Sequence, residues 1–287
     1  MSGHITLKRG DNDKTATWGG SKLKDAPPYT VENLQKDLKT VGAATTSPDA
    51  DFGKGTEKSL KIFQWVCGNL TACIKNSSHF STIKNTAISP TGKLDETTLK
   101  ELKKWVVDKQ TVTGDLVRVT FDSLTNIEAG SGFKKLGSTK VFASELVISK
   151  AAVSLIKDLN AEAKKKSVTI KINQAFREHG TKVTGAVVPP ATKSQHLIGH
   201  ALDCNIVDGN NWNNSATFKQ KKETKNAKDI IAALKKVGFR WGGDFSRVDT
   251  PHFDKKLDCS LFDYDAKFYL NQRAISENHA IPKETMS

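Results

Sequence analysis

The sequence has no apolar run that approaches the roughly 20 residues of a membrane-spanning helix. Its first ten residues also lack the apolar segment and the small-residue cleavage site of a secretory signal. The first absence excludes a membrane-spanning protein. The second predicts a protein made in the cytoplasm without a signal peptide, so that another route must carry it if it acts elsewhere.

Cysteine is scarce as well. The chain of 287 residues has four cysteines, Cys67, Cys73, Cys204 and Cys259. They are too few for a disulfide scaffold, and none forms the CxxC pair of a cysteine-ligated zinc site. Cys67 and Cys73 can pair if the protein meets an oxidising compartment, and isolated buried thiols fit the sequence equally well.

Basic residues are in clear excess. Lysine and arginine number 44 against 31 aspartates and glutamates, which gives a net charge of +13. Such a surface attracts polyanions, which include nucleic acid, anionic lipid and acidic cell-wall polymers. No basic helix, zinc-finger spacing or aromatic RNA-binding motif accompanies the lysines. We therefore predict that nucleic acid is not a partner.

The first part of the chain follows a helical pattern. Apolar residues recur at helical spacing in three stretches, which hold Val31, Leu34, Leu38 and Val41, then Leu60, Phe63, Trp65 and Val66, and last Leu99, Leu102 and Val106. Gly42 is a stop signal after the first stretch, and Thr56 is the expected N-cap of the second. The third helix is expected from Thr97 to Val107. These signals predict a three-helix unit with its core in residues 29–107.

Two dipeptides that end in glutamine lie within these helices, and two segments rich in Gly and Asp lie in the turns between them. They are Leu34-Gln35, Asp51-Phe52-Gly53-Lys54-Gly55-Thr56, Phe63-Gln64, and Gly92-Lys93-Leu94-Asp95-Glu96-Thr97 with Leu99. This pattern resembles the helical peptidoglycan-binding domain found on many cell-wall hydrolases. The resemblance implies a wall-binding domain over residues 1–110, whereas ordinary helix packing is the structural alternative for the two glutamine pairs.

The spacing of apolar residues changes after the polar segment 109–114, where strand patterns join the helical ones. Residues 145–165 have helical spacing, and residues 168–172 alternate like a half-buried strand. Further elements are expected as strands at 201–207, 239–241 and 252–254 and as a helix at 225–237. Helices that flank a small antiparallel sheet predict an α+β domain over residues 115–275.

Two segments of this domain supply a set of metal-binding side chains. His196 and Asp203 lie either side of a turn at Gly199, and His252 follows Pro251 at the start of a strand. Two imidazoles and one carboxylate can hold Zn²⁺ and leave a fourth position for water, which zinc activates at neutral pH. The sequence therefore predicts a hydrolytic zinc site with His196, Asp203 and His252 as ligands.

Two further residues suit the same chemistry. Asp249 lies three residues before His252 and is placed to act as the general base. Arg177 follows the predicted 168–173 strand, where its planar guanidinium can bind a carboxylate or a developing oxyanion. Each residue alone also has a structural explanation, such as a turn cap or a surface ion pair. Their joint occurrence favours catalysis.

The order of these residues is similar to that in a known enzyme family. The motifs are Ser194-x-His196-x-x-Gly199-x-Ala201-x-Asp203, Trp241-Gly242-Gly243-Asp244-Phe245 and Asp249-x-Pro251-His252-Phe253. They resemble zinc peptidases that are D-alanyl-D-alanine carboxypeptidases and L-alanyl-D-glutamate endopeptidases, and in particular the phage endolysins of that group. Arg177 lies in an Ala-Phe-Arg-Glu context, whereas the family usually has Gly-Tyr-Arg-Ser.

The resemblance implies the role of each site residue. His196, Asp203 and His252 are expected to bind zinc, Asp249 to be the base, and Arg177 with Ser194 to contact substrate. His200 is expected to be structural. The function implied is hydrolysis of an amide bond in peptidoglycan stem peptides, with L-alanyl-D-glutamate endopeptidase as the first hypothesis.

Three alternatives to this function stay open. They are a D-alanyl-D-alanine carboxypeptidase, a secreted antibacterial effector with the same chemistry, and a wall-binding protein with a structural zinc. In each enzymatic case we expect a monomer that acts on the wall, in the periplasm or outside the cell, after release.

Overall fold

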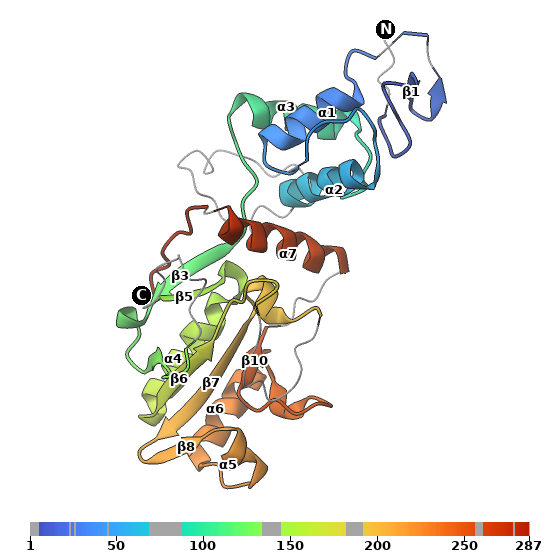
Figure 1. Ribbon diagram of the computed structural model, residues 1–287. Coiled ribbons are helices and arrows are strands. Elements are labelled where there is room, and N and C mark those ends of the chain that lie inside the picture. Colours follow the sequence, from blue (N-terminus) through green and yellow to red (C-terminus); the bar gives the residue numbers. More distant parts are fainter. Residues whose placement is uncertain are drawn as a thin grey trace. The chain divides into compact units, whose positions relative to one another are not determined.

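A computed structural model describes most of the chain (Figure 1). The described residues are 6–22, 24–25, 27–44, 46–68, 88–133, 145–181, 192–255, 261–277 and 279–286. The chain divides into two compact units, Met1–Thr113 and Gly114–Ser287, which are called the N-terminal and the C-terminal unit below. Cys67 and Cys204 are buried, and Cys73 and Cys259 lie outside the described residues.

The described part of the N-terminal unit contains helices and a short hairpin. Its elements are β1 (Thr17–Trp18), β2 (Ser21–Lys22), α1 (Val31–Thr40), α2 (Lys54–Gly68) and α3 (Glu96–Val107). Thr30 and Asp95 cap α1 and α3, because each side chain accepts a hydrogen bond from a backbone N–H of the first turn. Thr56 lies inside α2, so the expectation that it caps this helix was wrong.

Gln35 ties α1 to the loop that precedes α2. Its Nε2 donates to Asp49 Oδ1 at 2.7 Å, to the Asp51 carbonyl at 3.0 Å and to Thr56 Oγ1 at 2.9 Å. Its Oε1 accepts from the backbone N–H groups of Asp49 and Ala50. Since buried polar groups need hydrogen-bond partners, this side chain determines the path of the loop.

Gln64 has the equivalent role on α2. Its Nε2 donates to the Lys93 carbonyl at 2.9 Å and to Thr98 Oγ1 at 3.2 Å, and its Oε1 accepts from the Gly92 N–H at 2.8 Å. Each glutamine of the two sequence pairs thus joins one helix to the turn in front of the next. The pairs have a structural role in this fold.

The main sheet of the C-terminal unit has the strand order β4-β6-β7-β10-β9, and β8 pairs with the part of β7 beyond β10. The strands are β4 (Ile127–Ala129), β6 (Thr169–Gln174), β7 (Ala201–Asp208), β8 (Asn211–Asn213), β9 (Arg240–Trp241) and β10 (His252–Asp254). Neighbouring strands are antiparallel except β4 and β6, which are parallel. The prediction of a small antiparallel sheet was therefore wrong at that edge.

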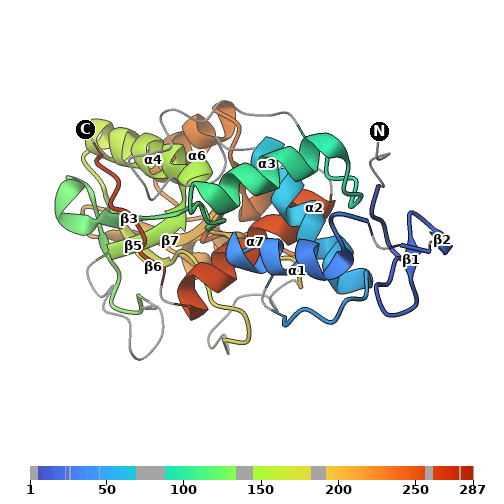
Figure 2. The ribbon, with the colours of Figure 1, turned by 90° about the horizontal axis from the view of Figure 1, so that it is seen from above.

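Helices flank this sheet, and the whole is a mixed α/β structure compatible with the α+β class. They are α4 (Val153–Lys166), α5 (Ser215–Lys219), α6 (Lys225–Lys236) and α7 (Leu261–Ser276). Helices α4 and α6 lie side by side against the sheet, as Figure 2 shows. Helix α7 packs on the 3₁₀ turn Gln195–Ile198. No helix among the described residues has the length and apolar character needed to cross a membrane.

The segment expected as one helix from 145 to 165 is in fact two elements. Strand β5 (Glu145–Ser149) pairs antiparallel with β3 (Leu116–Thr120), and a short 3₁₀ turn then leads into α4. All five residues of β5 are buried, so its apolar residues do not alternate with polar ones. Because apolar and polar residues do not alternate in β5, its sequence has no strand pattern. The position of Val147 fits the helical spacing of α4 only by coincidence.

Candidate active site

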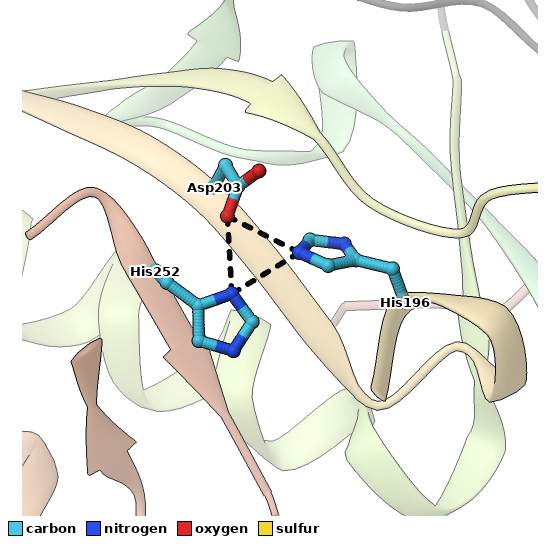
Figure 3. Close-up of side chains that lie close together, drawn as sticks. All are labelled: His196, Asp203 and His252. Atoms are coloured by element: carbon cyan, nitrogen blue, oxygen red, sulfur yellow. Dashed lines mark hydrogen bonds and ion pairs between the residues drawn. The ribbon is translucent and has the colours of Figure 1, made fainter. Parts of the chain in front are cut away.

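His196, Asp203 and His252 come from three elements and point toward one another (Figure 3). His196 lies in the 3₁₀ turn, Asp203 on β7 and His252 on β10. Gly199 ends the turn at a φ of +76°, where a Cβ atom would lie 2.6 Å from the Ser149 backbone nitrogen. Only glycine fits this position without strain, so Gly199 allows the chain to reverse between His196 and Asp203.

The register of the sheet brings Asp203 and His252 together. The two residues are direct partners in the antiparallel pair of β7 and β10. Directly opposite side chains on one face of a sheet have Cβ atoms about 5 Å apart, which suits two ligands of one ion. A shift of one residue would turn one of them to the other face.

The three donor atoms form a nearly equilateral triangle. His196 Nε2 lies 3.1 Å from Asp203 Oδ1 and 3.1 Å from His252 Nδ1, and His252 Nδ1 lies 3.2 Å from Asp203 Oδ1. Ligands of a tetrahedral zinc ion with bonds of about 2.0–2.1 Å are about 3.3–3.4 Å apart. The observed spacing and the donor types therefore fit zinc, and among the described residues this is the set found close enough to hold a metal ion.

Each imidazole uses its second nitrogen for a hydrogen bond. His196 Nδ1 lies 2.7 Å from the Ala175 carbonyl, to which it must donate. His252 Nε2 lies 3.0 Å from Asp254 Oδ2, and Asp254 is almost completely buried. In the neutral form of each ring, these contacts favour the proton on the outer nitrogen and leave the nitrogen that faces the triangle with a lone pair, as metal binding requires.

The protonation of Asp203 and His252 affects how this site can bind a cation. Burial raises the pKa of Asp203, but the charges and hydrogen bonds of His196 and His252 outweigh it and hold the pKa well below its ordinary value. Burial lowers the pKa of His252, and its hydrogen bonds to Asp203 and Asp254 raise it to about 9. A His252 pKa of about 9 means that a metal ion must displace a proton from this imidazole when it binds beside the ionised Asp203.

Asp249 lies at the entrance to β10 and belongs to the same environment. Its backbone N–H donates to the Gly242 carbonyl at 2.8 Å, and its carbonyl accepts from the His252 N–H at 3.0 Å. A Cβ at Gly242 would lie 2.1 Å from the Asp249 carbonyl oxygen, so this glycine allows the close approach. Burial, and then the Asp203 carboxylate, raise the pKa of Asp249. A raised pKa suits a group that accepts a proton and returns it.

Arg177 is buried beside the ligand turn. Its backbone N–H donates to the His196 carbonyl at 3.0 Å, and its Nη1 donates to Gln174 Oε1 at 3.2 Å. Burial lowers the pKa of Arg177, and the Asp203 carboxylate opposes this shift. The guanidinium is thus close enough to Asp203 of the candidate metal site to be affected by its charge, and there it can bind an anionic group.

The other two residues considered from the sequence have different surroundings. Ser194 precedes the ligand turn, and its carbonyl accepts from the Tyr264 hydroxyl at 2.8 Å. His200 points into a buried polar cluster, where its Nε2 lies 3.0 Å from Lys267 Nζ and its Nδ1 lies 3.0 Å from the Lys255 carbonyl. His200 is therefore not part of the ligand triangle, in agreement with its expected structural position.

Sequence reasoning missed two groups that support the site. Asp254 with Arg240 supports His252, and Gln272 on α7 supports the Arg177 segment. Asp254 had a signal in the sequence, because residues two apart on a strand share one face. Gln272 had none, since the residues with which its side chain forms hydrogen bonds are distant in sequence.

Comparison with known proteins bears on part of the C-terminal unit. Residues 189–255 match a protein-family model described as D-alanyl-D-alanine carboxypeptidase. The matched segment contains His196, Asp203, Asp249 and His252, and it ends before α7. No curated protein matches the chain. At the level of the family, the match supports a peptidoglycan-related peptidase of a kind that uses zinc.

Proposed function

We propose that this protein is a zinc-dependent peptidoglycan peptidase that hydrolyses an amide bond in stem peptides, as an L-alanyl-D-glutamate endopeptidase. The observation that carries the proposal is the meeting of His196 Nε2, Asp203 Oδ1 and His252 Nδ1 at distances of 3.1–3.2 Å. These atoms would hold the metal. When bound, zinc supplies the Lewis-acid chemistry that activates water and polarises a carbonyl group.

Asp249 moves the proton in this mechanism. Its carboxylate accepts a proton from the attacking water as the new C–O bond forms, and it delivers that proton to the amine nitrogen as the C–N bond breaks. The raised pKa of Asp249 supports this double role, because the protonated form is then reached more easily.

Arg177 binds and orients the substrate. Stem peptides are rich in carboxylates, and a guanidinium pairs with a carboxylate through two parallel hydrogen bonds. The buried position of Arg177 beside His196 supports a role close to the scissile bond. Ser194, which precedes His196 by two residues, is the second proposed substrate contact.

The N-terminal unit is proposed to bind the wall. Its sequence resemblance and the net charge of +13 of the whole chain support binding to an anionic polymer. Attachment would raise the local concentration of cleavable peptides. Co-sedimentation of residues 1–113 with purified sacculi tests this role, and a protein that stays in the supernatant contradicts it.

Digestion of purified sacculi tests the enzymatic proposal. Zinc-loaded protein should release fragments with a new N-terminal D-glutamate, detected by mass spectrometry, and a chelator should abolish the release. Unchanged sacculi in the presence of zinc contradict the proposal and favour a wall-binding protein with a structural metal.

A D,D-carboxypeptidase is the second candidate, favoured by the description of the matching family model. It would release free D-alanine and create no new amino terminus, so the same digest distinguishes the two activities. The biological setting proposed is phage lysis or antibacterial attack from outside. Lysis of permeabilised bacteria by added protein is the expected result.

A further inference from the structure

We propose that Asp254 and Arg240 are positioning residues that select which nitrogen of His252 binds the metal. This inference rests on the proposed zinc site. Neither residue belongs to the ligand set, and they act on the metal only through the imidazole of His252.

The argument begins with the position of Asp254 on β10. It lies two residues after His252, so both side chains project from the same face of the strand. Asp254 Oδ2 is 3.0 Å from His252 Nε2, and the Asp254 side chain is 1% exposed. The carboxylate therefore meets the imidazole away from water, where a charge-assisted hydrogen bond is strongest.

This contact determines the tautomer of His252. A carboxylate can only accept, so when a metal ion takes the place of any proton on Nδ1, the remaining proton of the imidazole sits on Nε2 and is donated to Asp254. The lone pair is then on Nδ1, the atom that lies 3.2 Å from Asp203 and 3.1 Å from His196. In the other tautomer the Nε2 lone pair would face Asp254, and Nδ1 would carry a hydrogen into the metal position.

Arg240 holds Asp254 in the required orientation. It lies on β9 directly opposite Asp254, and its Nε and Nη2 donate to Oδ1 and Oδ2 at 2.7 and 2.6 Å. This bidentate pair offsets the cost of burying the carboxylate. It also leaves Oδ2 shared between Arg240 and His252, so rotation of Asp254 would break both contacts.

Phe245 contacts both Arg240 and His252. The Arg240 guanidinium lies 5.0 Å from the Phe245 ring centre, and that ring is 5.7 Å from the ring of His252. His252, Asp254, Arg240 and Phe245 therefore contact one another in a cycle. Such a cycle restricts both the tilt and the flip of the imidazole.

The other imidazole is supported differently. His196 donates from Nδ1 to the neutral carbonyl of Ala175 and presents Nε2 to the metal position. A carboxylate raises the basicity of an imidazole more than a carbonyl does, since it stabilises the partial positive charge on the ring. His252 is thus the ligand whose donor strength depends on a side chain that mutation can remove.

Zinc affinity is the measurement that tests this proposal. Competition with a chromophoric chelator gives the Kd, and cobalt substitution gives a visible spectrum that reports the ligand geometry. We expect Asp254→Ala to weaken zinc binding about 10–100-fold, Asp254→Asn about 10-fold, and Arg240→Lys by less. The cobalt spectrum of each variant should change accordingly.

Glu145→Gln is the matched control. Glu145 also lies on a strand and pairs with an arginine on the neighbouring strand, Arg118, at 3.0 Å. Its removal should cost stability but leave the zinc Kd within about twofold of the wild type. Circular dichroism and thermal unfolding of the metal-free proteins show which variants remain folded, and Asp254→Asn serves if Asp254→Ala does not.

The outcomes separate the two proposals. A wild-type protein that binds no zinc removes the proposed function together with the positioning role. A wild-type protein that binds zinc and cleaves sacculi, with folded Asp254 variants of equal affinity, overturns the positioning role alone. Equal losses of affinity in the Asp254 and Glu145 variants would also overturn it, because the effect would then reflect general stability.

Discussion

Two aspartates of the site differ in environment and therefore in chemistry. The pKa of Asp203 is held low because two imidazoles outweigh the effect of its burial. The pKa of Asp249 is raised by burial and by the charge of Asp203. Pairs of acids whose surroundings separate their pKa values divide the roles of a catalytic site. The ionised acid suits the metal, and the acid with the raised pKa suits proton transfer.

Replacing Asp249 by Asn should abolish proton transfer without disturbing metal binding. We expect kcat to fall about 10²–10⁴-fold, the usual contribution of a general base. Product release from sacculi gives the rate, and metal analysis gives the zinc content, which should stay at the wild-type level. Asp244→Asn is the control, because Asp244 is half exposed in the same region and pairs with Lys235. Similar rates for the Asp249 and Asp244 variants would exclude Asp249 as the base.

Replacing Arg177 by Lys should weaken substrate binding. Lysine keeps the charge but cannot pair with a carboxylate through two parallel bonds. We expect KM for a soluble stem peptide to rise about 10-fold, which equals about 1.4 kcal/mol of binding free energy. Steady-state kinetics check this, with Arg118→Lys as a control in the same unit. An unchanged KM with a reduced kcat would instead indicate a contact formed only in the transition state.

At the scale of elements, α7 joins the two segments that carry site residues. Gln272 Nε2 donates to the carbonyls of Arg177 and Leu197 at 2.9 and 2.7 Å, and its Oε1 accepts from the His179 N–H at 2.7 Å. One side chain thereby ties the Arg177 segment to the turn that holds His196. This helix lies beyond the residues that match the family model.

Removing the Gln272 side chain should lower the stability of the C-terminal unit. Gln272→Ala leaves three backbone groups without their partner, so we expect the free energy of unfolding to fall by about 1–3 kcal/mol. Chemical denaturation measures this loss. Gln220→Ala is the control, because Gln220 is exposed at the end of α5. Equal stability of the two variants would show that the Gln272 contacts contribute nothing.

At the scale of the whole molecule, buried charge makes stability depend on pH. Burial, and then the neighbouring Lys267, lower the pKa of His200 to about 4, although Asp115 opposes the shift. Lys255 also lowers it, although the Lys255 carbonyl accepts a hydrogen bond from the ring. His200 is therefore neutral in the folded protein at pH values where an unfolded histidine is charged.

The sign of the pH effect follows from this difference. An unfolded histidine binds a proton below a pKa of about 6.5, whereas folded His200 does so only near 4. Stability should thus fall as the pH falls from about 6.5 to 4, by at most about 1.4 kcal/mol per pH unit from this group. Urea unfolding of the metal-free protein at several pH values measures the slope. His200→Gln should reduce the slope, and an unchanged slope would assign the acid sensitivity to other groups.

Much of the site could be predicted because its signals are local. The spacing of His196, Gly199 and Asp203 and the pairing of Asp249 with His252 require only a turn and a strand. The strands and helices near these residues also have strong periodicity, as in β6 and α6. The prediction failed at β5, where burial on both faces removed the alternation that distinguishes a strand from a helix.

The donor types and the turn between them could be predicted from the amino-acid sequence alone, and these donors favour zinc. The tertiary structure was needed to show which nitrogen of each imidazole faces the proposed metal position, since this depends on Ala175 and Arg240 in other segments and on the contact of His252 with Asp254. It likewise decided that α7 holds the Arg177 segment, through contacts of Gln272 more than 70 residues away. The physical reason is that strand register and helix packing set the direction of a side chain, and neither is encoded in a local motif.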